Sequence, residues 1–535
     1  MDRFVRFLAF KPLFDLPLIG SFLNMMKMIP IDPSSPTQIK ESMDQAREGL
    51  RNGELVCIFP EGMITRTGQI HGIRRGVEKL GQMEDVPVVP IHLDEVWGSI
   101  FSFESGRFFW KVPARIPYPV NVSFGNPLDK AVTRTDVREA IQILGAQSAK
   151  RRVHNEKLLP HKFIRTARGN FWRKAVVDST QETSVRFGTL LVMVLAMRNR
   201  LNRMMNDQQR VGILLPPTLV GNVINIALSF LGITSVNLNY TTGQETLESA
   251  IRQSELDTVI TSKLFLRKVE LDIPEDVDML EAQRLADDVS LLDKTRAFVS
   301  AFLPSRAINS LFCSVEDPDE ILTVIFSSGS TGEPKGIKLS YANISANLES
   351  IQQVASFDGS DRMLGILPFF HSFGYTGTIW LPMVMGFGVI YHADPMDARE
   401  IGELMGKWDG SVIIATPTFL RLYKRRCTVE QFDNLRFVIC GAEKLKGSLA
   451  KSFNEKFGVW PLEGYGCTEL SPVISVNVPN VQYQGKVFQK GRKQGSVGRP
   501  LPGVAVRIVD PDSGERLEDG EEGLILTQGA NRMEG

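Results

Sequence analysis

One stretch decides the fold, and it reads Ile325-Phe326-Ser327-Ser328-Gly329-Ser330-Thr331-Gly332-Glu333-Pro334-Lys335-Gly336. An apolar, β-branched run from Leu322 to Phe326 leads into it, so the sequence predicts a buried strand that ends in a loop of glycines and hydroxyls. Glycine lets backbone N–H groups converge on an anion, and hydroxyl and ammonium groups add further donors. We therefore predict a phosphate-binding loop made of Ser327, Ser328, Gly329, Ser330, Thr331 and Gly332, with the charge of Lys335 beside it.

The neighbours of Lys335 distinguish this loop from the Walker A type. A Walker A loop has the order Gly-x-x-x-x-Gly-Lys-Ser/Thr and opens directly into a helix, whereas Lys335 stands between Pro334 and Gly336. An ordinary surface loop of serine and glycine is the alternative interpretation. The stretch resembles the signature loop of the adenylate-forming (AMP-binding) superfamily of acyl-CoA and acyl-carrier-protein synthetases. That resemblance implies that the loop binds the phosphates of ATP.

Composition narrows the class of protein. The 535 residues are more than one domain usually holds, and the 61 basic and 61 acidic residues cancel, so no overall field favours nucleic acid. The cysteines are scattered without a C-x-x-C pair, which is typical of a reducing cytoplasm and predicts no zinc site; they are Cys57, Cys313, Cys427, Cys440 and Cys467. We expect a cytoplasmic protein without a secretory signal.

An uncharged run extends between Arg210 and Glu245 and is long enough for a membrane span. Its prolines, asparagines and glycines divide it instead into a strand over 211–215, a helix over about 220–231 and a second strand. Further strands are predicted over 258–261, 322–326, 362–367, 388–392, 411–416 and 435–440. Alternating β and α elements indicate an α/β protein with doubly wound, mostly parallel sheets that bind ligands at the carboxyl ends of strands.

The first 149 residues have a mixed α/β pattern of their own. Helical spacing over 39–50 is followed by a strand over 55–59, by Pro60-Glu61-Gly62, and by a second apolar strand over 86–91. This order resembles the glycerophospholipid acyltransferase family, in which Phe59, Pro60, Glu61 and Gly62 would bind the phosphate of the acyl acceptor. With Ile29-Pro30-Ile31-Asp32-Pro33, it is most similar to the bifunctional 2-acylglycerophosphoethanolamine acyltransferase/acyl-carrier-protein synthetases.

One part of that acyltransferase machinery is missing. The family uses a His-x-x-x-x-Asp pair upstream of the Ile-Pro-Ile-Asp segment, and its histidine takes the proton of the acceptor hydroxyl. No histidine precedes His71 in this chain, and Met63 stands where the subfamily often has arginine. We therefore predict that residues 1–149 form a truncated or inactive acyltransferase-like domain.

A basic segment follows this domain. Residues 150–174 contain nine lysines and arginines and a single acid, Glu156, with Phe163, Phe171 and Trp172 among them. We predict a linker over 150–182. It is either a solvated tether or a surface for anionic lipid headgroups or an acidic carrier protein, because each basic residue near an anionic membrane contributes about 1 kcal/mol of binding.

Further motifs follow the loop in the order that the adenylate-forming resemblance requires. Pro368-Phe369-Phe370-His371 resembles the aromatic–histidine motif of the family, whose histidine lies between the nucleotide and the acyl group. A packed core histidine is the alternative. Gly441, Ala442 and Glu443 close a predicted strand, and the resemblance implies that their backbone lines the adenine.

The segment Glu463-Gly464-Tyr465-Gly466-Cys467-Thr468-Glu469 completes the predicted site. Tyr465 offers a ring for adenine stacking, Thr468 a hydroxyl for the α-phosphate, and Glu469 a hard oxygen ligand for Mg²⁺. A glycine-rich turn with an incidental Thr-Glu is the alternative. The resemblance thus implies an AMP-binding domain over 183–535, with ATP and Mg²⁺ as cofactors and with Lys335, His371, Thr468 and Glu469 as catalytic residues.

The resemblance also implies a substrate and partners. They are a long-chain fatty acid, acyl carrier protein or CoA, a lysophospholipid, and peripheral contact with the inner face of the cell membrane. The family's later Thr-Gly-Asp motif and small C-terminal domain do not occur in this sequence, so we expect a chain shortened at both ends. Two alternatives remain, namely lysophospholipid acyl transfer as the main activity and a non-catalytic protein that binds ATP or lipid.

Overall fold

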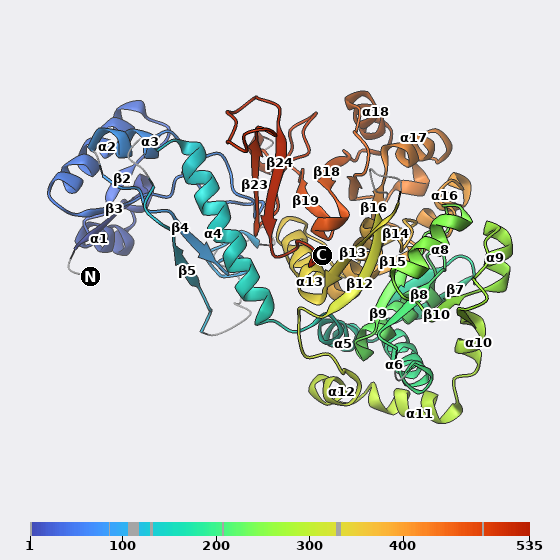
Figure 1. Ribbon diagram of the computed structural model, residues 1–535. Coiled ribbons are helices and arrows are strands. Elements are labelled where there is room, and N and C mark those ends of the chain that lie inside the picture. The colour runs from blue at the N-terminus through green and yellow to red at the C-terminus, as the bar shows by residue number, and fades with distance from the viewer. Residues whose placement is uncertain are drawn as a thin grey trace. The chain divides into compact units, whose positions relative to one another are not determined.

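The computed structural model of the chain describes residues 3–84, 86–104, 117–128, 132–205, 208–327, 333–483 and 486–535. The chain divides into two compact units (Figure 1). Unit 1 comprises Met1–Ser148 and Pro502–Gln528, and unit 2 comprises Ala149–Leu501 and Gly529–Gly535. The predicted α/β class is confirmed.

Unit 1 is built on a parallel sheet with the strand order β2-β1-β3. Its small core joins Leu8, Ile29, Ala46 and Leu80. The elements are β1 (Val5–Phe10), η1 (Lys11–Leu13), α1 (Pro17–Met25), β2 (Ile29–Ile31), α2 (Pro36–Arg51), β3 (Leu55–Cys57), α3 (Gly76–Glu84), β4 (Ile91–Asp94), β5 (Asn121–Phe124), α4 (Arg134–His154), β23 (Val504–Val509) and β24 (Leu524–Gly529). The residues of α4 after Ser148 and the last residue of β24, Gly529, belong to unit 2.

The strand predicted over 86–91 is wrong in position. The regular strand β4 begins only at Ile91, and it pairs with β5. Upstream of it, Val88 forms an isolated bridge to Leu128. Proline has no N–H to donate to a ladder, so Pro87 and Pro90 interrupt the pairing that the apolar pattern suggested.

The first sheet of unit 2 carries the predicted phosphate loop. Its strand order is β11-β10-β8-β9-β12-β13, with every neighbouring pair parallel except β12 and β13. The strands are β8 (Arg210–Ile213), β9 (Thr234–Asn237), β10 (Thr258–Thr261), β11 (Asp278–Glu281), β12 (Ile321–Ser327) and β13 (Lys335–Ser340). The strand predicted over 322–326 is therefore present as β12.

The uncharged run between Arg210 and Glu245 forms β8, α7 (Leu219–Leu231) and β9, as predicted. Thr218 caps α7 by accepting the N–H of Gly221, and Gly232 ends it with a left-handed φ of 76°. Most of α7 is buried within the unit, which explains why the run lacks charge. Within the described ranges, no helix combines the length and apolar character needed to cross a membrane.

The second sheet of unit 2 has the order β22-β19-β18-β17-β16-β14-β15-β6-β7, and its central strands are parallel. The strands are β6 (Lys174–Asp178), β7 (Thr183–Arg186), β14 (Arg362–Gly365), β15 (Gly388–Tyr391), β16 (Val412–Ala415), β17 (Phe437–Cys440), β18 (Leu462–Gly466), β19 (Val473–Val476) and β22 (Arg499–Pro500). A separate pair is formed by β20 (Val481–Tyr483) and β21 (Lys486–Gln489).

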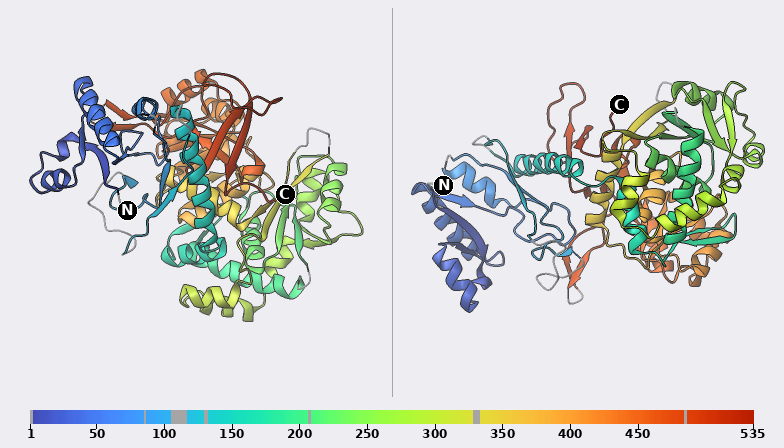
Figure 2. Two further views of the ribbon diagram at one scale, coloured as in Figure 1. Left: turned by 60° about the vertical axis from the view of Figure 1, so that its left-hand side comes forward. Right: turned by 90° about the horizontal axis from the view of Figure 1, so that it is seen from below.

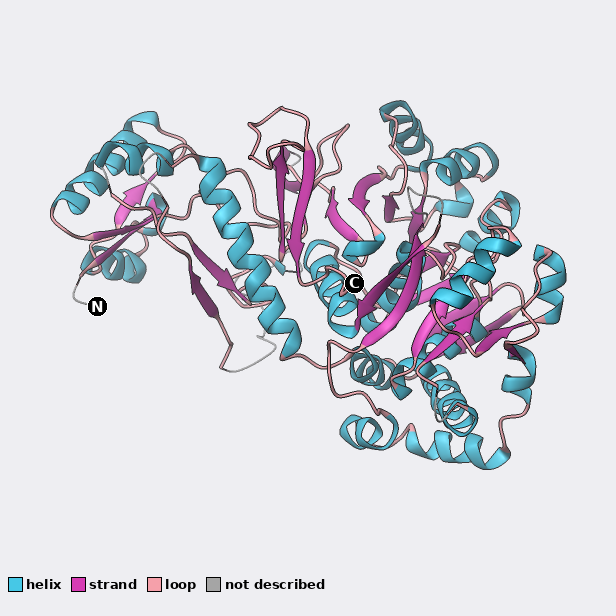
Figure 3. Cartoon of the chain, viewed as in Figure 1, coloured by secondary structure: helices cyan, strands magenta, loops and turns pink. Residues whose placement is uncertain are grey.

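Helices pack around the sheets of unit 2 (Figure 3). Its largest core includes Leu191, Ile224 and Trp380, all fully buried. The helices are α5 (Leu159–Gly169), α6 (Phe187–Met204), α8 (Gln244–Gln253), α9 (Lys263–Val269), α10 (Ala282–Asp287), α11 (Leu291–Ser300), α12 (Ser305–Phe312), α13 (Tyr341–Val354), α14 (Ser372–Gly374), η3 (Tyr375–Trp380), α15 (Leu381–Met385), α16 (Ala398–Lys407), α17 (Pro417–Arg426), η4 (Glu430–Phe432), α18 (Gly447–Phe457) and η5 (Thr468–Leu470).

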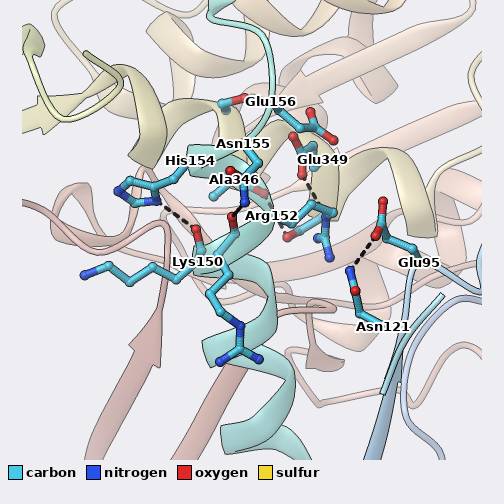
Figure 4. Close-up of polar contacts among 12 residues, drawn as sticks. Glu95, Asn121, Lys150, Arg152, His154, Asn155, Glu156, Ala346 and Glu349 are labelled. Atoms are coloured by element: carbon cyan, nitrogen blue, oxygen red, sulfur yellow. Dashed lines mark hydrogen bonds and ion pairs between the residues drawn. The ribbon is translucent and has the colours of Figure 1, made fainter. Parts of the chain in front are cut away.

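The segment 150–182, predicted as a basic linker, contains α5 and β6 and lies within unit 2. The ammonium of Lys162 is 2.8 Å from Glu349 Oε1 and 2.7 Å from Glu156 Oε2. Arg152 Nε is 3.4 Å from Glu349 Oε2 (Figure 4). Glu349 lies on α13, far along the chain. The local composition could not show this acidic partner, and so it allowed a solvated tether. In the structure, Lys162 and Arg152 instead pair with Glu349.

Candidate functional site

The predicted phosphate loop connects β12 to β13. Ser327 ends β12, Lys335 begins β13, and the two residues are paired across the antiparallel ladder. Lys335 is exposed and Ser327 is half-buried. The other predicted ligands, Ser328, Gly329, Ser330, Thr331 and Gly332, lie outside the described residues. Ser327 and Lys335 thus stand at the carboxyl end of β12, where α/β sheets bind ligands.

The second predicted motif, Glu463–Glu469, begins within β18 of the other sheet and continues into the turn after it. Tyr465 is an exposed residue of β18, and Thr468 and Glu469 begin the short turn η5. Buried hydrogen bonds hold this turn from behind, because Asn531 Nδ2 donates to the carbonyl of Leu470 (2.7 Å) and Ser471 Oγ donates to the carbonyl of Asn531 (2.8 Å). The turn is therefore fixed by residues about sixty positions along the chain.

The pKa of Cys467 shows how the charge of Glu469 acts within this turn. Burial raises the pKa of the Cys467 thiol, and the neighbouring Glu469 carboxylate raises it further, to about 11. A nearby negative charge opposes ionisation of a thiol. Cys467 therefore stays protonated at neutral pH and reports on the charge of Glu469.

The aromatic–histidine segment lies against the same turn. Ser372 Oγ is 3.2 Å from Thr468 Oγ1, and His371 Nδ1 accepts the backbone N–H of Phe373 (3.2 Å). Neighbouring groups displace water from the imidazole and so lower the pKa of His371, although the residue is partly exposed. His371 is therefore neutral near pH 7.

The residues predicted to line adenine come directly after β17. Ala442 has a left-handed φ of 66°, and Glu443 Oε2 accepts the hydroxyl of Thr418 at 2.7 Å. A Cβ built on Gly441 would lie 3.3 Å from the ring of Phe373. This backbone and the histidine segment therefore meet through Phe373, a contact that no local sequence signal indicated.

The C-terminal residues connect the two halves of the predicted site. Met533 N donates to the carbonyl of Glu469 (2.8 Å), Glu534 N donates to the carbonyl of Lys338 (3.0 Å), and Lys338 N donates to the carbonyl of Gly535 (2.9 Å). Lys338 belongs to β13, the strand that Lys335 begins. Backbone hydrogen bonds thus tie the hairpin of the phosphate loop to the Thr468–Glu469 turn. Sequence reasoning missed this bridge because such bonds do not depend on residue type.

A small apolar cavity of about 50 Å³ adjoins these motifs. It is lined by side chains from the segment after His371 and from β17, β18 and β19, including Phe373, Thr376, Leu381, Ile439, Leu462 and Val473. Thr376 and Leu381 belong to the segment that follows His371. The chemistry suits an apolar group, but the volume is well below the roughly 300–1,000 Å³ of ligand pockets.

A larger cavity of about 450 Å³ lies elsewhere in unit 2. Its lining includes Arg210, Thr234 and Ile321, the first residues of β8, β9 and β12. It therefore opens at the amino ends of these parallel strands. Ligands of α/β sheets bind at the opposite, carboxyl ends, so this cavity is not assigned to the predicted site.

The Phe59–Gly62 turn of unit 1 is held by contacts within the unit. Glu61 Oε2 accepts the backbone N–H of His71 (2.7 Å), and His71 is buried with Nε2 3.1 Å from Thr67 Oγ1. Gly62 has a left-handed φ of 66°, and a Cβ built there would lie 2.4 Å from Arg74 Nε. Arg74, which was not predicted, therefore places a guanidinium beside the turn.

Two family models match this chain. One, described as AMP-binding enzyme, matches residues 163–535, and the other, described as Acyltransferase, matches residues 1–94. The probable 4-coumarate–CoA ligase 3 of Dictyostelium discoideum is 34% identical over 216 residues, which are 39% of this chain and 37% of that protein. The long-chain-fatty-acid–CoA ligase of Bacillus subtilis is 24% identical over 351 residues, 61% of each protein. The chain thus spans less than two thirds of either relative.

Solved structures have the same fold. The N-terminal subdomain of Klebsiella oxytoca NpsA, in complex with 3-hydroxybenzoyl-AMSN, superposes with a TM-score of 0.58 at 16% identity, covering 72% of this chain and 88% of that chain. O-succinylbenzoate coenzyme A synthetase (MenE) of Bacillus subtilis, in complex with ATP and magnesium ion, gives 0.57 at 21% identity, covering 70% and 72%. At such identities the likeness concerns the fold alone.

Proposed function

This chain belongs to the AMP-binding enzyme family, and from that premise we propose that it activates a fatty acid as an acyl-adenylate and passes the acyl group to a thiol. One observation carries the proposal. The C-terminal bridge ties β13, which begins with Lys335, to the turn that carries Thr468 and Glu469. This contact supports our proposal that the hairpin binds phosphate and shares one site with the turn that carries the Glu469 carboxylate.

The proposed reaction has two steps. A carboxylate oxygen of the acid attacks the α-phosphorus of ATP, the bond from that phosphorus to the bridging oxygen breaks, and pyrophosphate leaves. The sulfur of the thiol then attacks the acyl carbonyl, its proton passes to water, and AMP leaves. Positioning of the reactants and compensation of phosphate charge accelerate such transfers.

The described residues have the chemistry for the first step. Lys335 would compensate charge on the leaving pyrophosphate, while Thr468 would donate to the α-phosphate. Tyr465 and the backbone of Gly441–Glu443 would hold adenine. His371, whose Nδ1 accepts the backbone N–H of Phe373, would lie between the nucleotide and the acyl group as a neutral imidazole.

Magnesium fits the donor set at Glu469. The described part of the chain holds no group of three or more His, Cys, Asp and Glu side chains suited to a metal. Mg²⁺ beside a nucleotide needs only one or two protein carboxylates, because phosphates and water supply its other ligands. When bound it would neutralise phosphate charge. The MenE structure of the same fold is in complex with ATP and magnesium ion, which supports the choice of these cofactors.

The acyl group and the acceptor are proposed from chemistry and likeness. The apolar cavity lining supports a hydrocarbon substituent, and one relative is a long-chain-fatty-acid–CoA ligase. CoA and acyl carrier protein are both thiols that suit the second step, and the resemblance to the bifunctional family favours the carrier protein. The same resemblance supports a place in the cytoplasm, at the inner face of the membrane.

Unit 1 is proposed to bind a lysophospholipid without transferring an acyl group to it. The match of residues 1–94 to an acyltransferase model and the guanidinium of Arg74 beside Gly62 support binding of a phosphate-bearing lipid. His71 is buried and bonded to Thr67, so it is not placed to remove a proton from an acceptor. Turnover of lysophosphatidylethanolamine that vanishes in His71→Ala would favour the alternative, lysophospholipid acyl transfer as the main activity.

Fatty-acid-dependent exchange of pyrophosphate into ATP tests the proposed adenylation directly. The full chain should show exchange that requires both the acid and Mg²⁺, and ATP with Mg²⁺ should raise its Tm, because a ligand of the native state stabilises it. Exchange should fall in Thr468→Ala and persist in the surface control Thr428→Ala. A chain that gains stability from ATP but shows no exchange with any fatty acid would support the non-catalytic alternative.

A further inference from the structure

We propose that one face of unit 2, formed by α11, the start of the following turn, α12 and the segment after α5, docks on the surface of an anionic lipid membrane. We call this the outer apolar face. Its members are large apolar residues that are exposed: Trp172, Leu291, Leu292, Phe298, Val299, Phe302 and Leu311. In Figure 1 and Figure 2, α11 and α12 lie along the margin of unit 2, outside α5 and α6.

Helix α11 exposes its large apolar residues to solvent and buries small and polar ones, which is the reverse of an ordinary surface helix. Asp293, Ala297 and Ser300 face inward and are buried, while Leu291 and Leu292 keep 81% and 73% of their surface exposed. Phe298 and Val299 share that outward side. A surface helix normally turns its apolar stripe to the core, so this arrangement indicates a face that is covered by something apolar.

An aromatic row makes the face continuous across two segments of the chain. Ring centroids are 5.2 Å apart for Phe298 and Phe302, 5.3 Å for Phe302 and Phe171, and 5.0 Å for Phe171 and Trp172. Trp172, at the end of the row, is 72% exposed. Tryptophan suits the boundary between hydrocarbon and water, because its ring is apolar and its N–H needs a polar partner.

The charges around the face favour an anionic bilayer. Over residues 290–313 the cations are Lys294, Arg296 and Arg306, all exposed, and the only acid is Asp293. Just before this stretch Asp287 and Asp288 are exposed, and Asp288 Oδ2 is 3.7 Å from Arg200 Nη2. Asp293 is bound to Arg203, with Nη1 and Oδ1 2.9 Å apart, and that contact lowers the pKa of Asp293 to about 2. The carboxylate is therefore neutralised inside the unit, and the three cations remain for lipid headgroups.

A second copy of the chain is a poorer occupant. A two-fold interface would bring the same patch of both copies together, and so would bring the cations Lys294, Arg296 and Arg306 of one copy close to those of the other. An anionic membrane meets both the apolar residues and the cations. The proposal deepens the proposed function, since a fatty acid partitions into membranes, but vesicle binding is measured without ATP, so its failure would leave the adenylation result untouched.

Sedimentation with lipid vesicles tests the proposal on the full chain. It should bind vesicles of phosphatidylglycerol and phosphatidylcholine, and bind pure phosphatidylcholine less. Leu291→Glu/Phe298→Glu should lower the partition constant at least tenfold, because two large apolar side chains no longer enter the bilayer. Arg296→Ala should lower it about fivefold on the anionic vesicles only. Leu264→Glu, at a leucine of α9 that is 80% exposed, is the matched control and should bind normally.

Fluorescence places the face directly. Brominated lipid in the anionic vesicles should quench tryptophan emission of the full chain, and Trp172→Phe should remove most of that quenching. Helix α1 of unit 1 also exposes Leu18 and Phe22, so Leu18→Glu/Phe22→Glu is a competing variant. The proposal is overturned if only the α1 variant loses vesicle binding. It is also overturned if the chain dimerises in sedimentation equilibrium, the α11 variant is monomeric, and neither binds vesicles.

Discussion

The turn Phe59–Gly62 in unit 1 and the loop between Ser327 and Lys335 in unit 2 both follow a parallel strand, and both combine glycine with groups suited to phosphate. Their surroundings differ. In unit 1 the carboxylate of Glu61 is engaged by the backbone of His71. In unit 2, backbone hydrogen bonds connect the hairpin to the turn that contains Glu469. The carboxylate of Glu469 raises the pKa of the neighbouring Cys467 thiol. Two turns of similar composition thus differ in the segments that contact them, and these contacts cannot be inferred from the loop residues alone.

The largest effect is expected from Glu469→Gln. If this carboxylate stabilises the transition state of adenylation, exchange of pyrophosphate into ATP should fall on the order of a hundred- to a thousandfold, comparable with loss of one oxyanion donor. The affinity for ATP should fall much less. Glu455→Gln on α18, an exposed carboxylate paired with Lys451, should behave as wild type. Equal losses of rate and affinity would assign Glu469 to binding alone.

Lys335→Ala should come next. Loss of a charged hydrogen bond to phosphate should raise the Kd for ATP roughly tenfold to a hundredfold, and it should shrink the ATP-dependent rise in Tm accordingly. Lys451→Ala serves as the control in unit 2. Arg74→Ala in unit 1 should leave the ATP response unchanged, and a weakened response there would mean that the two turns do not act separately.

Gly62→Ala sharpens the comparison from the side of unit 1. A left-handed φ costs a non-glycine residue about 1–2 kcal/mol, and the new Cβ would also press on Arg74. Gly53 also has a left-handed φ, of 80°, but no heavy atom of the described residues lies within 4 Å of a Cβ built there, so Gly53→Ala isolates the cost of the backbone conformation. The free energy of unfolding of unit 1, measured with denaturant, should fall more in Gly62→Ala than in Gly53→Ala. Equal losses would show that Arg74 moves away freely.

The smallest expected effect is a change in the alkylation rate of Cys467, with Cys57 as the control. Burial raises the pKa of Cys57, at the end of β3, and burial together with Glu469 raises that of Cys467 to about 11. The alkylation rate of Cys467 should therefore increase with pH from 8 toward 11, because only the thiolate reacts. In Glu469→Gln the pKa of Cys467 should fall, and its alkylation at pH 8 should rise a few fold. Cys57 should not respond, and mass spectrometry of both peptides would reveal a general loosening if it did.

Much of unit 2 could be predicted because its signals are local. The apolar runs at 322–326 and 435–440 are present as β12 and β17, since buried parallel strands are apolar on both faces. The apolar run at 86–91 failed because prolines cannot complete a ladder. For the segment 150–182 the composition favoured either a tether or a surface for lipid headgroups or a carrier protein. It did not reveal Glu349, the partner of Lys162 and Arg152, because Glu349 lies nearly two hundred residues away.

The candidate site divides in the same way. Its chemical groups, Lys335, His371, Thr468 and Glu469, could be chosen from the sequence because their motifs resemble those of the adenylate-forming family and follow predicted strands. Their roles stay predictions, and five residues of the phosphate loop lie outside the described ranges. The contacts between motifs, such as Ser372 with Thr468, could not be chosen, because they join residues far apart along the chain.

The sequence by itself determined the α/β class, the strand that enters the phosphate loop, and the uncharged run that becomes β8, α7 and β9, because each depends on side chains close together in the chain. Only the tertiary structure decided that Met533 and Glu534 connect Glu469 to β13, because backbone hydrogen bonds do not depend on residue type. It also decided that Leu291 and Phe298 face outward on α11. Helical spacing shows that residues share a face, and only packing shows which way that face points.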